Sequence, residues 1–384
     1  MTQDFKILNF MRVSKPACIL SILLIIVSFV SLAVNGLKLG LDFTGGTQME
    51  VEFDRAADIP KVREILEDEG LESPVAILFG SDQEILIRTQ SSMQDGAVQK
   101  IEAALAPLGE DVALVEVGRA SAEFERFAHE LLISNAKPEQ LSEIFPEATY
   151  GEVSVAARGS EAIVRITKTL DNVYTEHLLA RLSDETESTA SLRRSEFVGP
   201  QIGEELRDEG GLGILCALFM VMLYVAMRFQ WKFSVGAVLG LMHDVIIVLG
   251  AFSLFNIDFD LTVLAAVLAV IGYSINNTIV IYDRVRDNFR TLRKSEPLEV
   301  LNISLTQTLE RTILTSLTTL LTLVMLYFFG GQLISGFALA LIIGIVAGTY
   351  SSFYIASSIL LGFKISREDL LPPVKEGAEF DGAP

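Results

Sequence analysis

Six long hydrophobic runs divide the chain, one near its start and five in its second half. The runs lie within residues 17–35, 212–227, 233–255, 261–281, 312–329 and 333–361. Runs of about 20 apolar residues have the length that a helix needs to cross the hydrocarbon core of a bilayer. The pattern predicts a polytopic α-helical membrane protein with six transmembrane helices. The last run is long enough to tilt strongly or to include a re-entrant piece.

The stretch between the first two runs has a different character. It is charged and contains no apolar run of membrane length. Residues 47–53 and 85–89 alternate like strands, whereas 59–69 and 97–108 have helical spacing. The order of elements through residue 117 is βαββαβ, the ferredoxin-like split unit. We therefore expect an α+β ferredoxin-like domain between helices 1 and 2.

This domain shows signs of an internal repeat. Gly80-Ser81 followed by a strand has a counterpart in Gly159-Ser160, and Val117-Gly118 has one in Val198-Gly199. The two copies would cover 47–118 and 119–199. The alternative, a chance similarity between two hairpins, stays open.

Lysine and arginine in the short loops assign the two sides of the membrane. The segments 1–16, 228–232, 284–311 and 363–384 each contain two or more Lys or Arg residues, whereas the turns 256–260 and 330–332 have none. Basic loops face the cytoplasm. No small-residue cleavage site follows the first run, so we expect a retained helix rather than a signal peptide. The predicted organisation is a cytoplasmic N-terminus (1–16), a first helix (17–35), a periplasmic domain (36–210), five further helices (211–362) and a cytoplasmic tail (363–384).

The composition is too apolar for an ordinary soluble protein, and with the side assignment above we expect a multi-pass protein of the cytoplasmic (inner) membrane. Half of the residues are hydrophobic, and the mean hydropathy is +0.44. The net charge of −19 argues against a nucleic-acid partner. Cys18 and Cys216 lie in apolar runs and predict no disulfide, and the three histidines have no metal-ligand spacing. We expect no metal and no cofactor.

Polar residues within the predicted helices are the candidate functional groups. Ser274, Asn276 and Asn277 interrupt the third hydrophobic run of the second half. Asp244, which follows His243, shares a helix face with Gly236 and Gly240, where a neighbouring helix can approach closely. Intramembrane carboxylates are costly and usually functional. A purely structural, hydrogen-bonded aspartate is the alternative.

Arg311 opens another polar stripe. Thr315, Thr318 and Thr322 follow it on one helical face. The arginine could pair with a carboxylate or line a file of water, and an interfacial arginine that reaches the lipid headgroups is an equal alternative. In the last run, small residues recur every four positions and predict a close-packing seam, at Gly336, Ala340, Gly344, Gly348 and Ser352.

Asp42, Gly45 and Gly46 stand where the first helix leaves the membrane. Paired glycines can adopt positive φ and turn the chain into the first strand. A phosphate-cradling loop is disfavoured, because no lysine follows and no strand precedes.

Several long motifs occur in the order that is typical of one family. They are LDFTGGTQMEVEF, EFVGPQIG, FQWKFSVGAV, MHDVIIVLG, GYSINNTIVIYDRVRDNFR, SLTQTLERTILTSLTTLLT and GFALALIIGIVAGTYSSFYIAS. Together they resemble the SecF family of the SecD–SecF protein-export complex, within the resistance–nodulation–division superfamily. The match covers both ends of the soluble domain and all six helices.

The resemblance implies a non-enzymatic accessory subunit that uses the proton-motive force late in export. Its implied partners are SecD, the SecYEG channel, YajC and the exported unfolded polypeptide. The linkers, with Asp42, Gly45, Gly46, Gly199 and Pro200, would couple the helices to the domain. A small-molecule or lipid exporter of the same superfamily is the alternative function. An intramembrane protease is disfavoured, since the helices contain no suitable paired motif.

Two features depart from the family. The soluble domain is about twice the usual length, with the extra copy inserted roughly between Gln90 and Ile166. The family commonly has Ser-x-Asn-Asp where this chain has Ser274-Ile275-Asn276-Asn277. An amide cannot take up and release a proton near neutral pH. Asp244 or the carboxylates of SecD would then carry the coupling, while Arg311 matches the family's arginine.

Overall fold

The computed structural model describes residues 7–365, except residues 110, 122–123 and 293–294. Most of the predicted cytoplasmic tail therefore lies outside the described residues. The chain divides into two compact units, one formed by Met1–Phe43 with Glu205–Pro384 and the other by Thr44–Glu204. We describe each unit by itself and refer to them as the membrane unit and the soluble domain.

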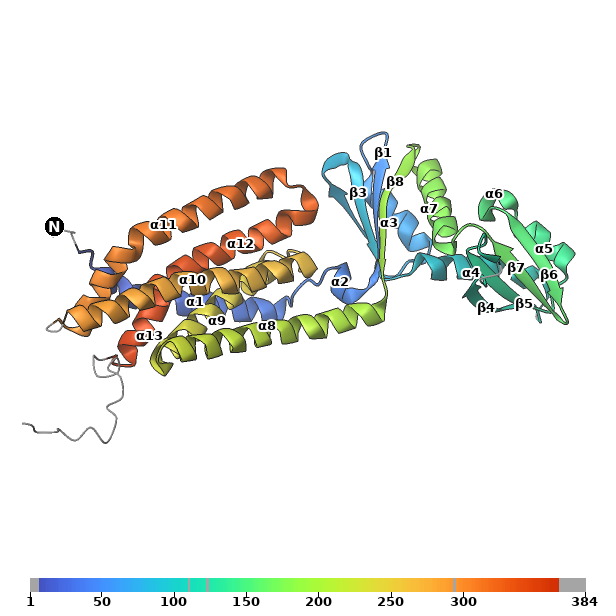
Figure 1. The fold of residues 1–384 in the computed structure, drawn as a ribbon. Coiled ribbons are helices and arrows are strands. Elements are labelled where there is room, and N and C mark those ends of the chain that lie inside the picture. The colour runs from blue at the N-terminus through green and yellow to red at the C-terminus, as the bar shows by residue number, and fades with distance from the viewer. Residues whose placement is uncertain (1–6, 110, 122–123, 293–294, 366–384) are drawn as a thin grey trace, which may run out of the picture. The chain divides into compact units, whose positions relative to one another are not determined.

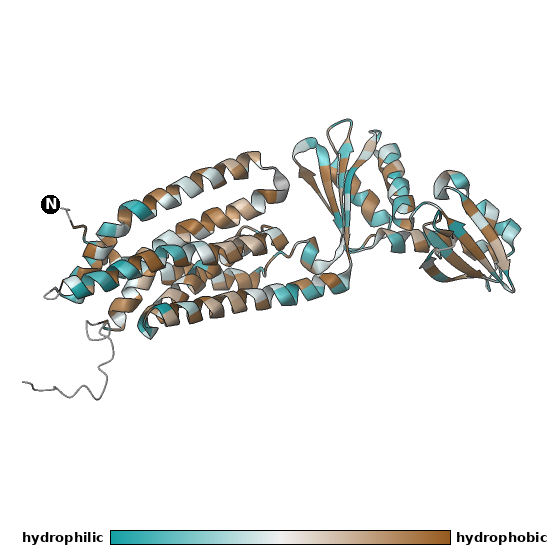
Figure 2. Cartoon of the chain, in the orientation of Figure 1, coloured by the Kyte–Doolittle hydropathy of each residue, from teal (hydrophilic) through white to brown (hydrophobic). Residues whose placement is uncertain are grey.

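Among the described residues, six helices of the membrane unit are long and apolar enough to cross a bilayer, which confirms the predicted number. Figure 2 shows hydrophobic residues along most of their length. The helices and short helical turns of this unit are η1 (Phe10–Val13), α1 (Ser14–Val34), α2 (Leu41–Thr44), α8 (Pro200–Arg228), α9 (Trp231–Leu254), α10 (Leu261–Thr291), α11 (Pro297–Phe329), α12 (Gln332–Ser351), the π-helical η4 (Ser352–Ala356) and α13 (Ser357–Gly362).

The basic segment 284–311 differs from its prediction as a loop. α10 continues to Thr291, and α11 begins at Pro297. Proline is well suited to the first turn of a helix, because its missing N–H would have no partner there. The charged residues at both ends extend the membrane helices instead of ending them, so α10 and α11 have 31 and 33 residues.

α9 and α10 form the centre of the membrane unit. α9 packs against α1, α10 and α12, and α10 also packs against α11. Phe233 and Phe252 of α9 and Val267 and Tyr282 of α10 are buried in the same hydrophobic cluster. By contrast, many large apolar side chains of α1, α8 and α11 are exposed. Such surfaces are suited to lipid or to another membrane subunit.

The small-residue stripe of α12 packs against α10. A Cβ atom on Gly344 would lie 2.1 Å from Val270, and one on Gly348 would lie 2.9 Å from Ser274. Farther along, the hydroxyls of Thr278 and Ser352 are 2.9 Å apart. The predicted seam is therefore a helix–helix contact within this chain. The long final run is a continuous helix with a π-helical segment, and the described residues contain no re-entrant loop there.

Within the residues that the structure describes, the soluble domain contains eight strands in two sheets. Its strands are β1 (Gly46–Phe53), β2 (Val75–Phe79), β3 (Ser81–Thr89), β4 (Ala113–Arg119), β5 (His129–Ser134), β6 (Val153–Arg158), β7 (Glu161–Ile166) and β8 (Ala190–Val198). Its helices are α3 (Ile59–Asp68), α4 (Met93–Leu105), η2 (Ala106–Leu108), α5 (Pro138–Ile144), α6 (Glu147–Tyr150) and α7 (Leu170–Thr186). The α+β class predicted from the sequence is confirmed.

The two sheets have the same antiparallel strand pattern. The first has the order β2-β3-β1-β8 and the second β4-β5-β7-β6. In each βαββαβ sequence, the first three strands enter one sheet and the closing strand enters the other. β8 therefore pairs with β1, and Gly46 lies opposite Val198. This exchange brings the entry and exit of the domain together, and it gives each sheet strands from both of the predicted copies, 47–118 and 119–199.

One hydrophobic cluster includes side chains from both sheets. Met49 and Val51 of β1, Leu131 and Ile133 of β5, and Leu178 of α7 all belong to it and are buried. α4 packs directly against α7. Exchange of the closing strands and a shared core therefore make the soluble domain one folding unit.

Candidate functional site

Asp244 is a buried carboxylate at a junction of three helices. Its exposed fraction is 0 %. Oδ2 accepts hydrogen bonds from Ser274 Oγ of α10 at 2.6 Å and from Ser351 Oγ of α12 at 2.9 Å. Gly348 leaves room for this arrangement, because a Cβ atom there would come within 3.3 Å of Oδ2. The glycines of α9 predicted that a neighbouring helix approaches closely. The carboxylate lies at such a contact between helices.

His243 extends the polar network toward α1. Its Nδ1 lies 2.9 Å from Asp244 Oδ1, and its Nε2 lies 3.1 Å from Ser21 Oγ. Ser21 donates to Tyr350 Oη at 3.2 Å, and Tyr350 donates to the carbonyl of Ala17 at 2.6 Å. A continuous chain of hydrogen bonds therefore connects Asp244 with the beginning of α1.

Sequence reasoning missed most of this network. It singled out Asp244 and Ser274 but assigned no role to Ser21, Tyr350 or Ser351. The sequence does hold a signal in α1, where Ser21, Ser28 and Ser31 are all buried in a run of apolar residues. Their partners depend on how helices cross, which one sequence does not specify.

The two asparagines of the central motif have different surroundings. Asn276 is exposed, whereas Asn277 is 3 % exposed. Among the described residues, Asn277 Nδ2 has no hydrogen-bond partner. Asn277 can therefore contribute polarity to the interior of the bundle, but an amide cannot hold a proton as a carboxylate does.

Arg311 does not join Asp244. It is exposed on α11, and within the described residues its side chain makes no ion pair or hydrogen bond. The hydroxyls of Thr315, Thr318 and Thr322 donate to carbonyls one turn earlier in their own helix. The pairing with a carboxylate that the sequence suggested is thus absent from the described part of this chain, and the stripe faces outward.

The linker after α1 is attached to the start of α10. Asp42 Oδ2 accepts the backbone N–H of Leu261 at 3.0 Å, and Lys38 forms an ion pair with Asp258 at 2.9 Å. A carboxylate is favourable at this position because helix N-termini carry partial positive charge. Asp42 therefore ties the segment that leads into the domain to the helix that carries Ser274.

The predicted linker glycines are closely packed. Gly45 and Gly46 have φ values of 70° and 118°. A Cβ atom on Gly45 would lie 2.8 Å from Pro200 Cα, and one on Gly46 would lie 2.2 Å from the Thr89 carbonyl. Gly199, in contrast, has open space around it. Glycine is required at 45 and 46 by backbone conformation and by the close approach of entry and exit.

A second buried charge lies in the soluble domain, where α3, α4 and α7 meet. The Glu69 side chain is 3 % exposed and bonds Arg181 at 2.6 Å and Lys100 at 3.1 Å. His177 and the Tyr174 hydroxyl are also within 3.3 Å of its oxygens. Burial alone would raise the pKa of Glu69, but these hydrogen bonds and charges outweigh it and lower the pKa to about 2. Sequence analysis gave no indication of this cluster.

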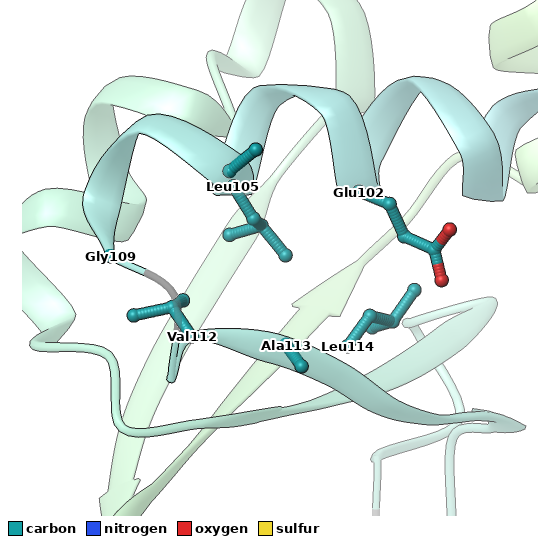
Figure 3. Close-up of a pocket in the computed structure, with 7 residues that line it drawn as sticks. Glu102, Leu105, Gly109, Val112, Ala113 and Leu114 are labelled. Carbon is teal, nitrogen blue, oxygen red and sulfur yellow. The ribbon is translucent and has the colours of Figure 1, made fainter.

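The soluble domain also has shallow pockets without a reactive constellation. Figure 3 shows one of 330 Å³ between the end of α4 and the start of β4. Glu102 is its one titratable side chain, and Leu105, Val112 and Leu114 are among its apolar lining. Over the described ranges, no group of three or more His, Cys, Asp and Glu residues is placed to hold a metal ion.

Comparisons with known proteins identify the family. The model "Protein export membrane protein SecD/SecF, C-terminal" matches residues 179–366, and "SecD/SecF GG Motif" matches residues 30–57. The protein translocase subunit SecF of Vibrio alginolyticus is 39% identical over 99% of this chain and 98% of its own. The SecF subunit of Pseudomonas aeruginosa is 41% identical over 95% of this chain and 94% of its own.

Solved structures give the same result. The crystal structure of SecDF from Thermus thermophilus, a translocon-associated membrane protein, matches with a TM-score of 0.67 at 29% identity. SecDF in a super-membrane-facing form matches with a TM-score of 0.56 at 30% identity. Each match covers 95% of this chain and 40% of the SecDF chain, so this chain corresponds to less than half of that protein. The chain is a multi-pass membrane protein that belongs to the SecF family of protein translocase subunits.

Proposed function

We propose that this chain pairs with SecD in the inner membrane and converts the proton-motive force into movement of its soluble domain during late protein export. Its termini are cytoplasmic and the soluble domain is periplasmic, as the basic loops indicate. The exported unfolded polypeptide is the substrate, and the SecYEG channel and YajC are further partners implied by the family. A SecD partner is consistent with a chain that corresponds to 40% of SecDF.

The observation that carries this proposal is the buried Asp244 network. A carboxylate that is 0 % exposed inside a membrane bundle is costly unless it is paired or functional. Asp244 binds hydroxyls of α10 and α12 and the ring of His243. Protonation would remove the negative charge that attracts these donors, so the packing of the helices would depend on the proton.

A mechanical route to the soluble domain begins at α10. Ser274 of α10 bonds Asp244, and the first residue of the same helix, Leu261, bonds Asp42. Asp42 is three residues before Gly45, which packs against Pro200. A shift of α10 would therefore be passed along the chain to the point where the domain begins and ends.

The energy available is sufficient for a shift between two packed states. One elementary charge that crosses the membrane potential supplies about 2.3 kcal/mol per 100 mV. Free-energy differences between two conformations of a protein are commonly a few kcal/mol. One or two protons per cycle would therefore change which state is populated.

Asp244→Asn tests the proposal in inverted membrane vesicles that contain the full chain with SecD. The amide keeps the shape but cannot ionise, so we expect gradient-dependent stimulation of export to be lost. Asp287→Asn makes the same chemical change at an exposed position at the end of α10 and should leave the stimulation unchanged. Full stimulation in the Asp244 variant would remove this residue from the mechanism.

Isolation from detergent distinguishes this function from small-molecule or lipid export. We expect the tagged chain to recover SecD and channel subunits. Recovery of self-contained trimers without SecD would favour an exporter. Membership of the SecF family supports the first outcome.

A further inference from the structure

The hydrogen bonds around His243 have a fixed direction. The carbonyl of Ala17 can only accept, so Tyr350 donates to it, and Ser21 in turn donates to Tyr350. Ser21 Oγ then needs a donor at 3.1 Å, which is His243 Nε2–H. At the other end, an ionised Asp244 needs a donor at 2.9 Å, which is His243 Nδ1–H. The arrangement satisfies every group when both ring nitrogens carry hydrogen.

We propose that His243 is a second proton-holding residue of this site, and that Ser21 and Tyr350 connect it to the beginning of α1. In this proposal, which rests on the proposed gradient coupling, Asp244 and His243 form a buried carboxylate–imidazolium pair. The pair is neutral overall, and burial of two opposite charges that are hydrogen-bonded costs less than burial of a lone carboxylate.

The proton balance of one transfer is simple. His243 releases its Nε2 proton to Ser21 Oγ while Ser21 passes its own proton to Tyr350, and Tyr350 passes its own proton to a water molecule at its partly exposed side. Each hydroxyl gains one proton and loses one, so one proton leaves the ring and no electrons move. Alternatively, the Nδ1 proton moves to Asp244 Oδ1, which leaves a neutral acid beside a neutral ring.

The surroundings of the ring support this role. The side chains that bond the pair come from α1, α10 and α12 and are Ser21, Ser274 and Ser351, none of which titrates near neutral pH. Besides Asp244 and His243, the network contains one more ionisable side chain, Tyr350. Tyr350 is partly exposed, so its hydroxyl can exchange a proton with water. Asn277 cannot bind the proton. His243 is therefore the group that gives this chain a second protonation state inside the bundle.

Nitrogen NMR of the full chain with SecD in lipid nanodiscs tests the protonation state. The chain has three histidines, and His129 and His177 lie in the soluble domain. The ring signals that disappear in His243→Gln therefore belong to His243. We expect the His243 ring to carry hydrogen on both nitrogens at neutral pH and to become neutral in Asp244→Asn. A neutral ring in the parent chain, or an imidazolium that persists in Asp244→Asn, would overturn the pair.

Proton uptake by proteoliposomes of the same complex, read with a pH-sensitive dye, tests the path. We expect Ser21→Ala and Tyr350→Phe each to slow gradient-driven uptake about tenfold, as loss of one strong hydrogen bond in a transfer path would. The matched controls are Ser31→Ala, on the same pair of helices, and Tyr282→Phe, which bonds Ala356 instead. Equal rates in test and control variants would exclude the path.

The two experiments separate this inference from the proposed function. If the complex takes up no protons and Asp244→Asn leaves export unchanged, the gradient coupling fails. The NMR result would still decide whether the buried pair exists. If coupling holds and the ring is neutral, the inference alone fails.

Discussion

At the scale of single residues, Asp244 is held by side chains of three helices, namely His243 of α9, Ser274 of α10 and Ser351 of α12. Asp244 stands in the middle of an apolar run, and its burial follows from helical spacing. Ser274 and Ser351 are 30 and 107 positions away, and they meet Asp244 because three helices cross there. For Arg311, helical spacing predicts which residues share its face of the helix. It does not predict that this face is exposed.

Glu69 provides a prediction for the soluble domain. We expect Glu69→Gln to destabilise it by about 1–2 kcal/mol, because the buried carboxylate loses its charge-assisted hydrogen bonds to Arg181 and Lys100, which are themselves partly exposed. Arg181 and Lys100 would keep their positive charge beside a neutral amide. Hydrogen exchange of α4 and α7 in the full-length protein measures the change, and exposed Glu67→Gln is the control. Equal protection in both variants would contradict the argument.

The same residue predicts a dependence on pH. The folded state lowers the pKa of Glu69 from 4.5 to about 2, so the ionised form stabilises the domain. This contribution is complete above pH 4.5 and is lost as the pH falls toward 2. Exchange protection, corrected for the intrinsic rate at each pH, should decrease through this window in the parent chain more than in Glu69→Gln.

At the scale of elements, hydropathy predicted the membrane helices and alternation predicted the first strands. The prediction of a loop over 284–311 is wrong for most of its length, because charged residues end a hydrophobic run without ending the helix. The exchange of β4 and β8 could not be predicted, since the order of elements along the chain is the same with or without it. Pairing of closing strands is decided by long-range contacts and not by local pattern.

The α10–α12 seam provides a prediction at this scale. We expect Gly344→Ala to destabilise the membrane unit by about 1–3 kcal/mol, the usual cost of overpacking, because the new methyl group would meet Val270. Gly272→Ala, on the exposed side of α10, meets no atom within 4 Å and should be neutral or slightly stabilising. Thermal unfolding of the full chain in nanodiscs compares the two. Equal melting temperatures would show that the seam tolerates a larger residue.

At the scale of the whole molecule, the proposed function links protonation of the Asp244 network in the membrane unit to movement of the soluble domain. The structure describes the network, the soluble domain and the two chain segments that connect them covalently. The membrane unit leaves large apolar side chains of α8 and α11 exposed, as expected for a chain that works beside another membrane subunit. Neither composition nor helix spacing could predict the proposed movement, because such a movement depends on two conformational states and a gradient.

A distance between the two units shows directly whether the soluble domain moves when a proton gradient is applied. Spin labels at Phe255→Cys, in the exposed α9–α10 turn, and at Glu143→Cys, on the exposed side of α5, report on the membrane unit and the soluble domain. Cys18 and Cys216 are replaced by serine, and the full chain is reconstituted with SecD. The account predicts that a proton gradient shifts the distance distribution in this protein and leaves it unchanged in Asp244→Asn. The same shift in both proteins, or no shift in either, would contradict it.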